Sequence, residues 1–251
     1  MDSKPLDIFI TCYLRQAYTE KTIEYLYERT KYPFRLFVID NGGNDEVLEE
    51  AVKQNKVFLW IKNSYNVGIH ASWNLALSMA ESEYFITSDN DIYVPDLGDS
   101  VNTQVTNDWL GTLIRYMNER PDYAAISLHP HIFIGAVGVD PQDPEDVKER
   151  NMCGAVMRIM RTDVIRKIGG WEHVIRTSRN HEERTICSKI HDAGYKVGVA
   201  TRIRAYHPFG ANWGYPEEIT PEMQGHNPDL IDYVMSFDKI QAYNNKTWMP
   251  L

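Results

Sequence analysis

The sequence is poor in cysteine and has none of the spacings that cysteine chemistry requires. Its 251 residues include three cysteines, which are Cys12, Cys153 and Cys187. No two of them form a CxxC pair, so a zinc site of that kind is not expected, and an odd number of widely separated cysteines builds no disulfide framework. Because each lies in an apolar run or a predicted helix, we expect three reduced cysteines in the core.

Long apolar segments are also missing. No window approaches the ~20 apolar residues that a transmembrane helix needs. The N-terminus lacks the basic flank, apolar stretch and small-residue cleavage site of a secretory signal. We therefore expect a soluble, cytoplasmic protein without a transmembrane segment, for which peripheral association with a membrane stays open.

Basic residues are outnumbered by acidic ones. The chain has 35 acidic and 26 basic residues, and its formal net charge is −9. Domains that bind nucleic acid carry lysine and arginine clustered on one face, and no such stripe is present, so nucleic acid is not an expected partner. An acidic protein that binds a diphosphate must neutralise it, and a metal held by carboxylates is one way to do so.

Short apolar runs alternate with helical patterns through the first 90 residues. The runs expected to be strands are 8–12, 34–39, 57–61 and 84–88, and the helical patterns between them cover 19–30, 45–54 and 69–80. This order predicts an α/β fold with a parallel sheet flanked by helices. A hydrophobic content of 43% over 251 residues suits one compact domain. Helix 19–30 is expected to begin with Thr19 as its N-cap.

Two carboxylates stand directly after the last of these strands. Asp89 and Asp91 flank Asn90 in a DXD pattern, at the carboxyl end of a predicted strand, where ligands bind in open α/β sheets. Magnesium binds through one or two carboxylates and leaves its other positions to water and to substrate phosphates. The pattern therefore indicates a Mn²⁺ or Mg²⁺ site and a diphosphate ligand, although a polar turn of the Asx kind explains it equally well.

Two further strand exits suit a nucleotide. Asp40 ends the second predicted strand beside two glycines that allow a close approach to the backbone, so its carboxylate is a candidate hydrogen-bond acceptor for a base or ribose. The alternative is an Asx turn leading into the next helix. Asn66 and Gly68 precede the helix 69–80, and the N-terminus of a helix suits an anion.

Together these motifs resemble the family 2 glycosyltransferases of the GT-A fold. The resemblance covers about residues 6–208 and rests on the order of nine segments. They are Ile8-Phe-Ile-Thr-Cys-Tyr13-Leu-Arg15, Phe37-Val-Ile-Asp40-Asn-Gly-Gly, Asn66-Val-Gly68 with Trp73-Asn74, Ser88-Asp89-Asn-Asp91, Cys153-Gly-Ala-Val-Met157, Ile168-Gly-Gly-Trp171, His181-Glu182-Glu183-Arg-Thr-Ile-Cys187, Ala193-Gly194-Tyr195 and Arg204-Ala-Tyr-His207.

The resemblance implies a single GT-A domain over 1–251, a Rossmann-like unit with a central, mostly parallel sheet. Residues 1–100 would form the nucleotide-binding half, 101–210 the acceptor-binding half and 211–251 a C-terminal lid or tail. The donor would be a UDP, GDP or dTDP sugar, because a carboxylate can pair with a ring N–H that all three bases possess. The acceptor would be a hydroxyl of a glycan or another glycoconjugate.

The resemblance also assigns nucleotide and metal contacts. Thr11 and Tyr13 would lie near the nucleobase, with Asp40 as the partner of the base. Asp89 would face the ribose or the metal, and Asp91 would bind the cation that bridges the two phosphates. His207 would be a further contact to the metal or the diphosphate, whereas the alternative for it is a histidine satisfied at a strand edge. The other matched residues expected at the nucleotide are Arg15, Asn66, Gly68, Asn74 and Asn90.

Glu183 occupies the place of the catalytic base in these enzymes. In an inverting transfer a carboxylate takes the proton of the acceptor hydroxyl while that oxygen attacks the anomeric carbon. The family most often has aspartate here, so a non-catalytic protein that binds nucleotide sugars or glycans is the alternative. The other reading of Glu182 and Glu183 is that they are acidic residues favoured in the first turn of a helix. Leu14 is a second departure, where relatives often carry asparagine.

Two rival enzyme classes are disfavoured by the exit of the first strand. A sugar nucleotidyltransferase needs a glycine-rich phosphate loop there, and a dehydrogenase needs GxGxxG. The segment Thr11-Cys-Tyr-Leu-Arg15 contains no glycine. Trp171, Trp213 and Tyr215 are candidates for stacking on sugar faces, although packing in the core or under a lid is the favoured explanation for each.

Overall fold

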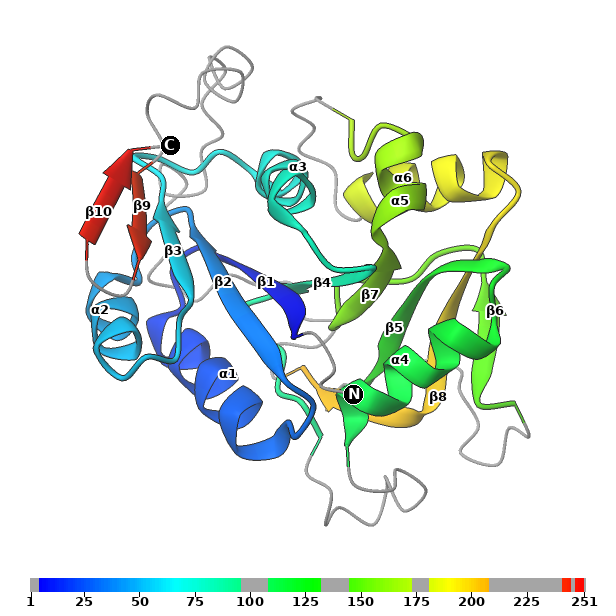
Figure 1. Cartoon of the computed structure of the whole chain (residues 1–251), viewed down its shortest axis with the longest axis horizontal. Helices are drawn as coiled ribbons and strands as arrows, with labels where there is room; N and C mark the ends of the chain where they lie inside the picture. Colours follow the sequence, from blue (N-terminus) through cyan, green and yellow to red (C-terminus); the bar gives the residue numbers. More distant parts are fainter. Residues whose placement is uncertain are drawn as a thin grey trace.

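The computed structural model describes residues 5–95, 108–131, 145–172, 181–207, 241–244 and 247–250. In these residues one mixed sheet of ten strands lies between two layers of helices (Figure 1). The elements in chain order are β1 Leu6–Cys12, α1 Gln16–Arg29, β2 Phe34–Asp40, α2 Asp45–Lys53, β3 Leu59–Lys62, α3 Ile69–Met79, β4 Tyr84–Asp89, α4 Trp109–Glu119, β5 Tyr123–His131, β6 Val147–Arg150, β7 Arg158–Arg161, α5 Thr162–Lys167, α6 His181–Asp192, β8 Lys196–Tyr206, β9 Gln241–Asn244 and β10 Thr247–Pro250.

The first half of the sheet has the parallel arrangement that the sequence predicts. β1 pairs in parallel with β2 and with β4, and β2 pairs in parallel with β3. All four predicted strands and all three predicted helices are present, with bounds that differ by a few residues. The alternation of short strands with helices therefore sets this part of the fold.

The second half of the sheet is mixed. β7 lies between β4 and β5 and runs antiparallel to both, whereas β5 and β8 are parallel. β6 pairs antiparallel with the outer side of β8, and at the far edge β9 pairs antiparallel with β3. The strand order is β10-β9-β3-β2-β1-β4-β7-β5-β8-β6.

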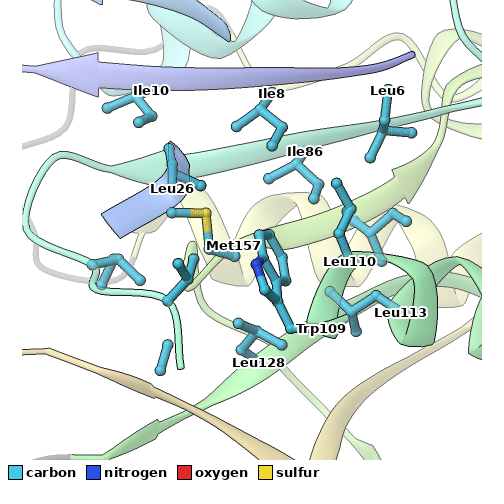
Figure 2. Packing of buried hydrophobic residues seen from close by; sticks show 14 of the residues in the cluster. Leu6, Ile8, Ile10, Leu26, Ile86, Trp109, Leu110, Leu113, Leu128 and Met157 are labelled. Carbon is cyan, nitrogen blue, oxygen red and sulfur yellow. The ribbon is translucent and has the colours of Figure 1, made fainter. Parts of the chain in front are cut away.

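Each face of the sheet has its own apolar core. α1, α2 and α4 cover one face, and α3, α5 and α6 cover the other (Figure 1). Successive strand residues point to opposite faces, so Ile8 and Ile10 pack with Trp109 and Met157 in the first core (Figure 2), and Phe9 belongs to the second. Fully burying a side chain of this size contributes about 1.5–3 kcal/mol, so burial on two faces holds the strands rigidly in place.

The start of α1 differs from the prediction. The helix begins at Gln16, three residues before Thr19, and Arg15 takes the N-cap position with a left-handed φ of 58°. Thr19 is not an N-cap. Its buried hydroxyl donates a hydrogen bond of 2.7 Å to Asn44 Oδ1. This contact connects α1 to the turn after β2 and explains why Thr19 lies inside the helix.

The predicted state of the cysteines is confirmed, since all three are buried and carry free thiols. The sequence is least regular over 94–108, 129–150 and 210–230. The last of these ranges lies outside the described residues, as does most of the other two, and the two ends of 129–150 belong to β5 and β6. Across the ranges that the structure covers, every helix is too short or too polar to cross a membrane.

Candidate active site

The polar ends of three parallel strands meet at one edge of the sheet. The register places Cys12 of β1 opposite Asp40 of β2, and Thr11 of β1 opposite Asp89 of β4. Asp40 and Asp89 therefore flank the exit of β1, and Asp91 follows two residues after β4. This is the carboxyl edge of the parallel strands, where ligands bind in open α/β sheets.

An antiparallel bridge brings His207 to the same place. The backbones of Tyr93 and Tyr206 exchange two hydrogen bonds of 2.8 Å. His207 follows Tyr206 directly, and its Nε2 lies 3.4 Å from Asp91 Oδ2. The structure thus joins His207, which is 116 residues away along the chain, to the DXD segment.

Arg15 and His207 both contact the carboxylate of Asp91. Its Oδ2 accepts a hydrogen bond of 2.5 Å from Arg15 Nη1, and the side chain is 1% exposed. Burial raises the pKa of Asp91, but the hydrogen bond from His207 and the charges of His207 and Arg15 outweigh it, so the pKa lies below its ordinary value. Burial lowers the pKa of His207, whereas its hydrogen bond to Asp91 and the charges of both aspartates raise it above the ordinary value.

Asp89 has the opposite character. Burial, followed by repulsion from Asp91, raises its pKa to about 7, although His207 and Arg15 oppose this shift. Two buried carboxylates that repel each other cannot both ionise freely. A cation placed between them would remove the conflict.

Asp91 also has an oxygen that nothing satisfies. Its Oδ1 is buried and accepts no hydrogen bond, which is costly unless a donor or a cation meets it. In the described ranges, no group of three or more His, Cys, Asp and Glu side chains is arranged to hold a metal by itself. Magnesium and manganese need only one or two carboxylates when phosphates and water complete the coordination. The residues present therefore fit a cation that is shared with a bound diphosphate.

Asp40 combines the two interpretations that the sequence left open. Its Oδ1 accepts hydrogen bonds from the Gly42 N–H at 2.9 Å and from Asn44 Nδ2 at 3.3 Å, so this oxygen forms the Asx turn. Oδ2 is buried and has no partner. Burial raises the pKa of Asp40, while its bonds to Gly42 and Asn44 oppose the shift. One carboxylate oxygen thus remains for a donor group of a ligand.

The exit of β1 has an uncommon backbone. Leu14 and Arg15 both have left-handed φ angles, of 55° and 58°, which cost non-glycine residues about 1–3 kcal/mol each. Gly43 has a φ of 83°, and a Cβ there would lie 3.2 Å from Leu14 Cα, so the position favours glycine. This conformation turns Arg15 onto Asp91. Thr11 is buried with an unpartnered hydroxyl oxygen, and Tyr13 is partly buried.

Two predicted contacts lie at the turn before α3. Asn66 Oδ1 accepts a hydrogen bond from the Gly68 N–H at 2.9 Å, and Gly68 has a φ of 80°. The helix then begins at Ile69 without a side-chain cap. Its first backbone N–H groups lack the usual side-chain acceptor, which suits an anion.

The side chains of Asn74 and Asn90 form hydrogen bonds within the protein. Asn74 forms two hydrogen bonds with the backbone of Trp171, accepting from its N–H at 2.9 Å and donating to its carbonyl at 3.1 Å. Asn90 is buried and donates to the Leu14 carbonyl at 3.1 Å and to Thr19 Oγ1 at 2.7 Å. Both therefore brace loops around the site, and their direct contact with a nucleotide stays a prediction.

The backbone of Ala155 lies between Glu183 and Asp89. Glu183 lies in the first turn of α6, and the N–H of Ala155 lowers the pKa of its carboxylate against the effect of burial. The carbonyl of Ala155 accepts a hydrogen bond from the Asp89 N–H at 3.3 Å. A Cβ at Gly154 would lie 3.1 Å from Glu183 Oε1. The segment 153–155 thus forms a backbone shelf between the DXD carboxylates and Glu183.

The two glutamates of α6 differ in ionisation. Burial, followed by the charge of Glu183, raises the pKa of Glu182 to about 8. The pKa of Glu183 is also raised by burial, although Arg158, the Ala155 N–H and His207 oppose this shift. Near neutral pH, Glu182 therefore holds a proton and Glu183 is the better candidate for an ionised base.

Sequence reasoning missed the residues of the shelf and Arg158. The segment from Cys153 to Met157 carried part of the resemblance, but no role was assigned to it, because it acts here mainly through backbone groups. Trp171 is fully buried against Trp73, with ring centroids 5.5 Å apart, so it is a core residue and does not stack on a sugar. Trp213 and Tyr215 lie outside the described residues.

The arrangement of this sheet and its polar edge is that of the GT-A glycosyltransferase fold. The chain belongs to glycosyl transferase family 2, whose family model matches residues 7–169. The expected family and fold are therefore confirmed.

Two curated relatives carry the same general name. An uncharacterized glycosyltransferase from Haemophilus influenzae is 26% identical over 139 residues, which are 53% of this chain and 39% of the relative. An uncharacterized glycosyltransferase from Methanocaldococcus jannaschii is 30% identical over 101 residues, which are 38% of this chain and 35% of the relative. The matched region is thus well under half the length of either relative.

Solved structures share the fold at low sequence identity. The crystal structure of S. aureus TarS has a TM-score of 0.63 at 17% identity, covering 82% of this chain and 37% of that one. The mannosyltransferase PcManGT from Pyrobaculum calidifontis, in complex with GDP-Man and Mn²⁺, has a TM-score of 0.62 at 14% identity and covers 83% and 58%. GalNAc-T7 with UDP, GalNAc and Mn²⁺ has a TM-score of 0.66 at 12% identity and covers 82% and 44%.

Proposed function

We propose that this protein is a metal-dependent, inverting glycosyltransferase, which moves a sugar from a nucleotide-diphosphate donor to a hydroxyl acceptor. The observation that carries the proposal is the backbone of residues 154 and 155, because the Ala155 carbonyl accepts a hydrogen bond from the Asp89 N–H and Glu183 Oε1 lies against Gly154. One rigid shelf thereby links the diphosphate side of the site to a carboxylate suited to act as a base.

The nucleotide would lie along the ends of β1, β2 and β4. Asp40 Oδ2 is the acceptor for a ring N–H of the base, and Thr11 and Tyr13 stand at the same strand exit. The first turn of α3, after Gly68, is available to the phosphates. The donor is a UDP, GDP or dTDP sugar, since all three bases carry a ring N–H for Asp40.

Asp91, together with Asp89 and His207, would hold Mn²⁺ or Mg²⁺. When bound, such a cation supplies Lewis-acid stabilisation of charge on the diphosphate. The solved structures of PcManGT and GalNAc-T7 contain Mn²⁺, which supports this choice for the present chain.

Glu183 would take the proton from the acceptor hydroxyl. As this proton passes to the carboxylate, the acceptor oxygen forms its bond to the anomeric carbon, and the bond from that carbon to the diphosphate oxygen breaks. The bonding electrons leave with the nucleoside diphosphate, and the configuration inverts because attack and departure occur on opposite faces. A positioned base typically contributes about 10²–10⁴-fold to the rate.

The proposed roles divide the chain into three parts. Residues 1–100 contain the base-binding and diphosphate-binding groups, and residues 101–210 contain Glu183 and its shelf. We assign the acceptor to the second part and a lid or tail role to residues 211–251.

A non-catalytic protein that binds nucleotide sugars or glycans is the second candidate. The longer glutamate at 183, where the family most often has aspartate, favours it. The two functions separate in one assay, in which purified protein is incubated with UDP, GDP or dTDP sugars, Mn²⁺ and a glycan pool, and free nucleoside diphosphate is measured. Release that depends on both metal and acceptor supports the transferase. Saturable binding of a nucleotide sugar without release supports the binding protein.

A further inference from the structure

Arg158 is a buried cation in an aromatic setting. It is the first residue of β7 and is 0% exposed. Its guanidinium carbon lies 4.7 Å from the ring centroid of Trp73 and 5.6 Å from that of Trp171. Nη1 donates to the Cys153 carbonyl at 3.2 Å and Nη2 to Thr87 Oγ1 at 3.4 Å, whereas Nε is buried without a partner.

Burying the guanidinium of Arg158 at this position costs desolvation free energy. Within the ranges that the structure describes, the guanidinium makes no ion pair. Contact with tryptophan faces and two neutral acceptors compensates part of the desolvation of a cation. An apolar side chain would fill the space between the two indoles without that cost. The position of Arg158 therefore points to a task that requires its charge and its N–H groups.

That task lies in the shelf formed by residues 153–155. Arg158 holds the carbonyl of Cys153 at the start of the shelf, and the thiol of Cys187, one turn after Glu183 on α6, donates to the same carbonyl at 3.9 Å. The next residue, Gly154, leaves just enough room for Glu183 Oε1. The N–H of the following residue, Ala155, lowers the pKa of the Glu183 carboxylate.

We propose that Arg158 is a positioning residue for Glu183, because it anchors the shelf against which the Glu183 carboxylate lies. This inference rests on the proposed transferase function. It assigns no contact with substrate to Arg158, which is buried on the core side of the shelf. Misplacing a catalytic group by ~1 Å can cost about 10²-fold in rate.

The electrostatic surroundings of Glu183 define the pH test. The charged groups that face it are Glu182 on α6, Arg158 on β7, Asp89 at the end of β4 and His207 after β8. Arg158 is the largest influence that lowers the pKa of Glu183 against the effect of burial. Removing its charge should therefore raise this pKa and move the acid limb of the kcat profile to higher pH.

The experiment compares Arg158→Met and Arg158→Lys with wild type and with Arg161→Met. Arg161 is on the same strand but donates to the carbonyls of Tyr123 and Met117, away from the shelf, so its variant controls for structural damage. For Arg158→Met we expect a fall in kcat of about 10²-fold, a shifted acid limb and an unchanged Kd for the nucleoside diphosphate. Arg158→Lys should restore part of kcat, whereas Arg161→Met should lower Tm without moving the pH profile.

Gly154→Ala provides a second variant if both Arg158 variants fail to fold. Its added methyl crowds Glu183 Oε1 and leaves Arg158 in place, so kcat should fall while nucleotide affinity is kept. A kcat that follows only the folded fraction, with an unmoved acid limb, would overturn the inference, as would full activity of Gly154→Ala. Wild-type turnover is measured first, because its absence refutes the transferase function itself, whereas an active wild type with unaffected variants refutes only the role of Arg158.

Discussion

Arg15 Nη1 donates a 2.5 Å hydrogen bond to Asp91 Oδ2. This places a guanidinium on the carboxylate that we assign to the metal. A cation bound at Asp91 must share the carboxylate with Arg15 or displace it toward the diphosphate, whose charge it is well suited to meet. The pair therefore couples metal binding to phosphate binding, and this coupling is measurable.

We predict that stabilisation by a nucleoside diphosphate depends on Mn²⁺ and on Asp91. A ligand at ~100 times its Kd should add about 2.7 kcal/mol to the free energy of unfolding. Thermal shifts with UDP, GDP and dTDP, with and without Mn²⁺, should show this gain in wild type and its loss in Asp91→Ala. Asp122→Ala, which removes an exposed carboxylate paired with Lys196, is the control. An Asp91→Ala protein that kept its Mn²⁺-dependent shift would exclude the metal assignment.

Asp40→Asn tests the contact with the base. The amide oxygen can keep the hydrogen bonds with Gly42 and Asn44. The amide nitrogen takes the place of Oδ2, so its N–H faces the ring N–H of the base and no hydrogen bond can form between them. The affinity for the cognate nucleotide should fall by about 1–3 kcal/mol. Titration calorimetry against wild type and the neighbouring variant Asp45→Asn measures the loss. Equal affinities in all three proteins would refute the contact.

Glu183→Gln should abolish transfer while leaving the donor bound. The amide is nearly isosteric with the carboxylate but cannot accept the acceptor proton, so kcat should fall by about 10²–10⁴-fold with an unchanged Kd for the nucleotide. Glu182→Gln should be milder, because adjacent residues of a helix point about 100° apart and Glu182 is already protonated near neutral pH. A larger loss of kcat in Glu182→Gln than in Glu183→Gln would assign the catalytic base to Glu182. No loss in either would remove the base from the mechanism.

Glu182 also makes the stability of the protein depend on pH. Its pKa rises from 4.5 to about 8 on folding, so the folded state holds a proton that the unfolded chain releases. The contribution of Glu182 to the free energy of unfolding should therefore be fully present below pH 4.5 and be lost as the pH rises toward 8. Asp89, with a pKa of about 7, changes stability in the same direction in every variant that retains it.

Comparing two proteins isolates the effect of Glu182. Glu182→Gln should have nearly the Tm of wild type at pH 5 and a higher Tm at pH 8.5, with a chelator present to remove metal effects. Glu49→Gln, an exposed change on α2, should show no such divergence. A constant difference in Tm between wild type and Glu182→Gln across this range would contradict the shifted pKa.

The sequence was informative wherever a functional side chain follows a strand. Asp40, Asp89 and Asp91 were predictable because the alternation of elements already implies which strand ends share an edge of the sheet. Asn90 follows the same strand end, and it donates to the Leu14 carbonyl and to Thr19 Oγ1, so its contact with a nucleotide stays a prediction. Trp171 looked suited to a sugar because an aromatic residue after two glycines suggests a loop, but its indole fills the core.

The remaining parts depend on contacts that no local pattern encodes. β7 has four residues and no hydrophobic period of its own, so its insertion between β4 and β5 emerges only from tertiary pairing. The shelf acts through the carbonyl and N–H groups of Cys153 and Ala155, and these groups are the same in every residue type. Arg158 reads as an ordinary basic residue until the two indoles around it are seen.

The register of β1 has a consequence for how this site can change during evolution. Asp40 and Asp89 stand on either side of β1, so two interstrand steps separate them, about 10 Å in total. That span is set by backbone hydrogen bonds and is insensitive to side chains. Substitutions at the strand exits can alter which base or cation is preferred, but the length available between the base contact and the diphosphate contact stays constant. The sheet thus fixes the distance between the two ends of the nucleotide site, and new specificity has to arise in the loops beyond the strand ends.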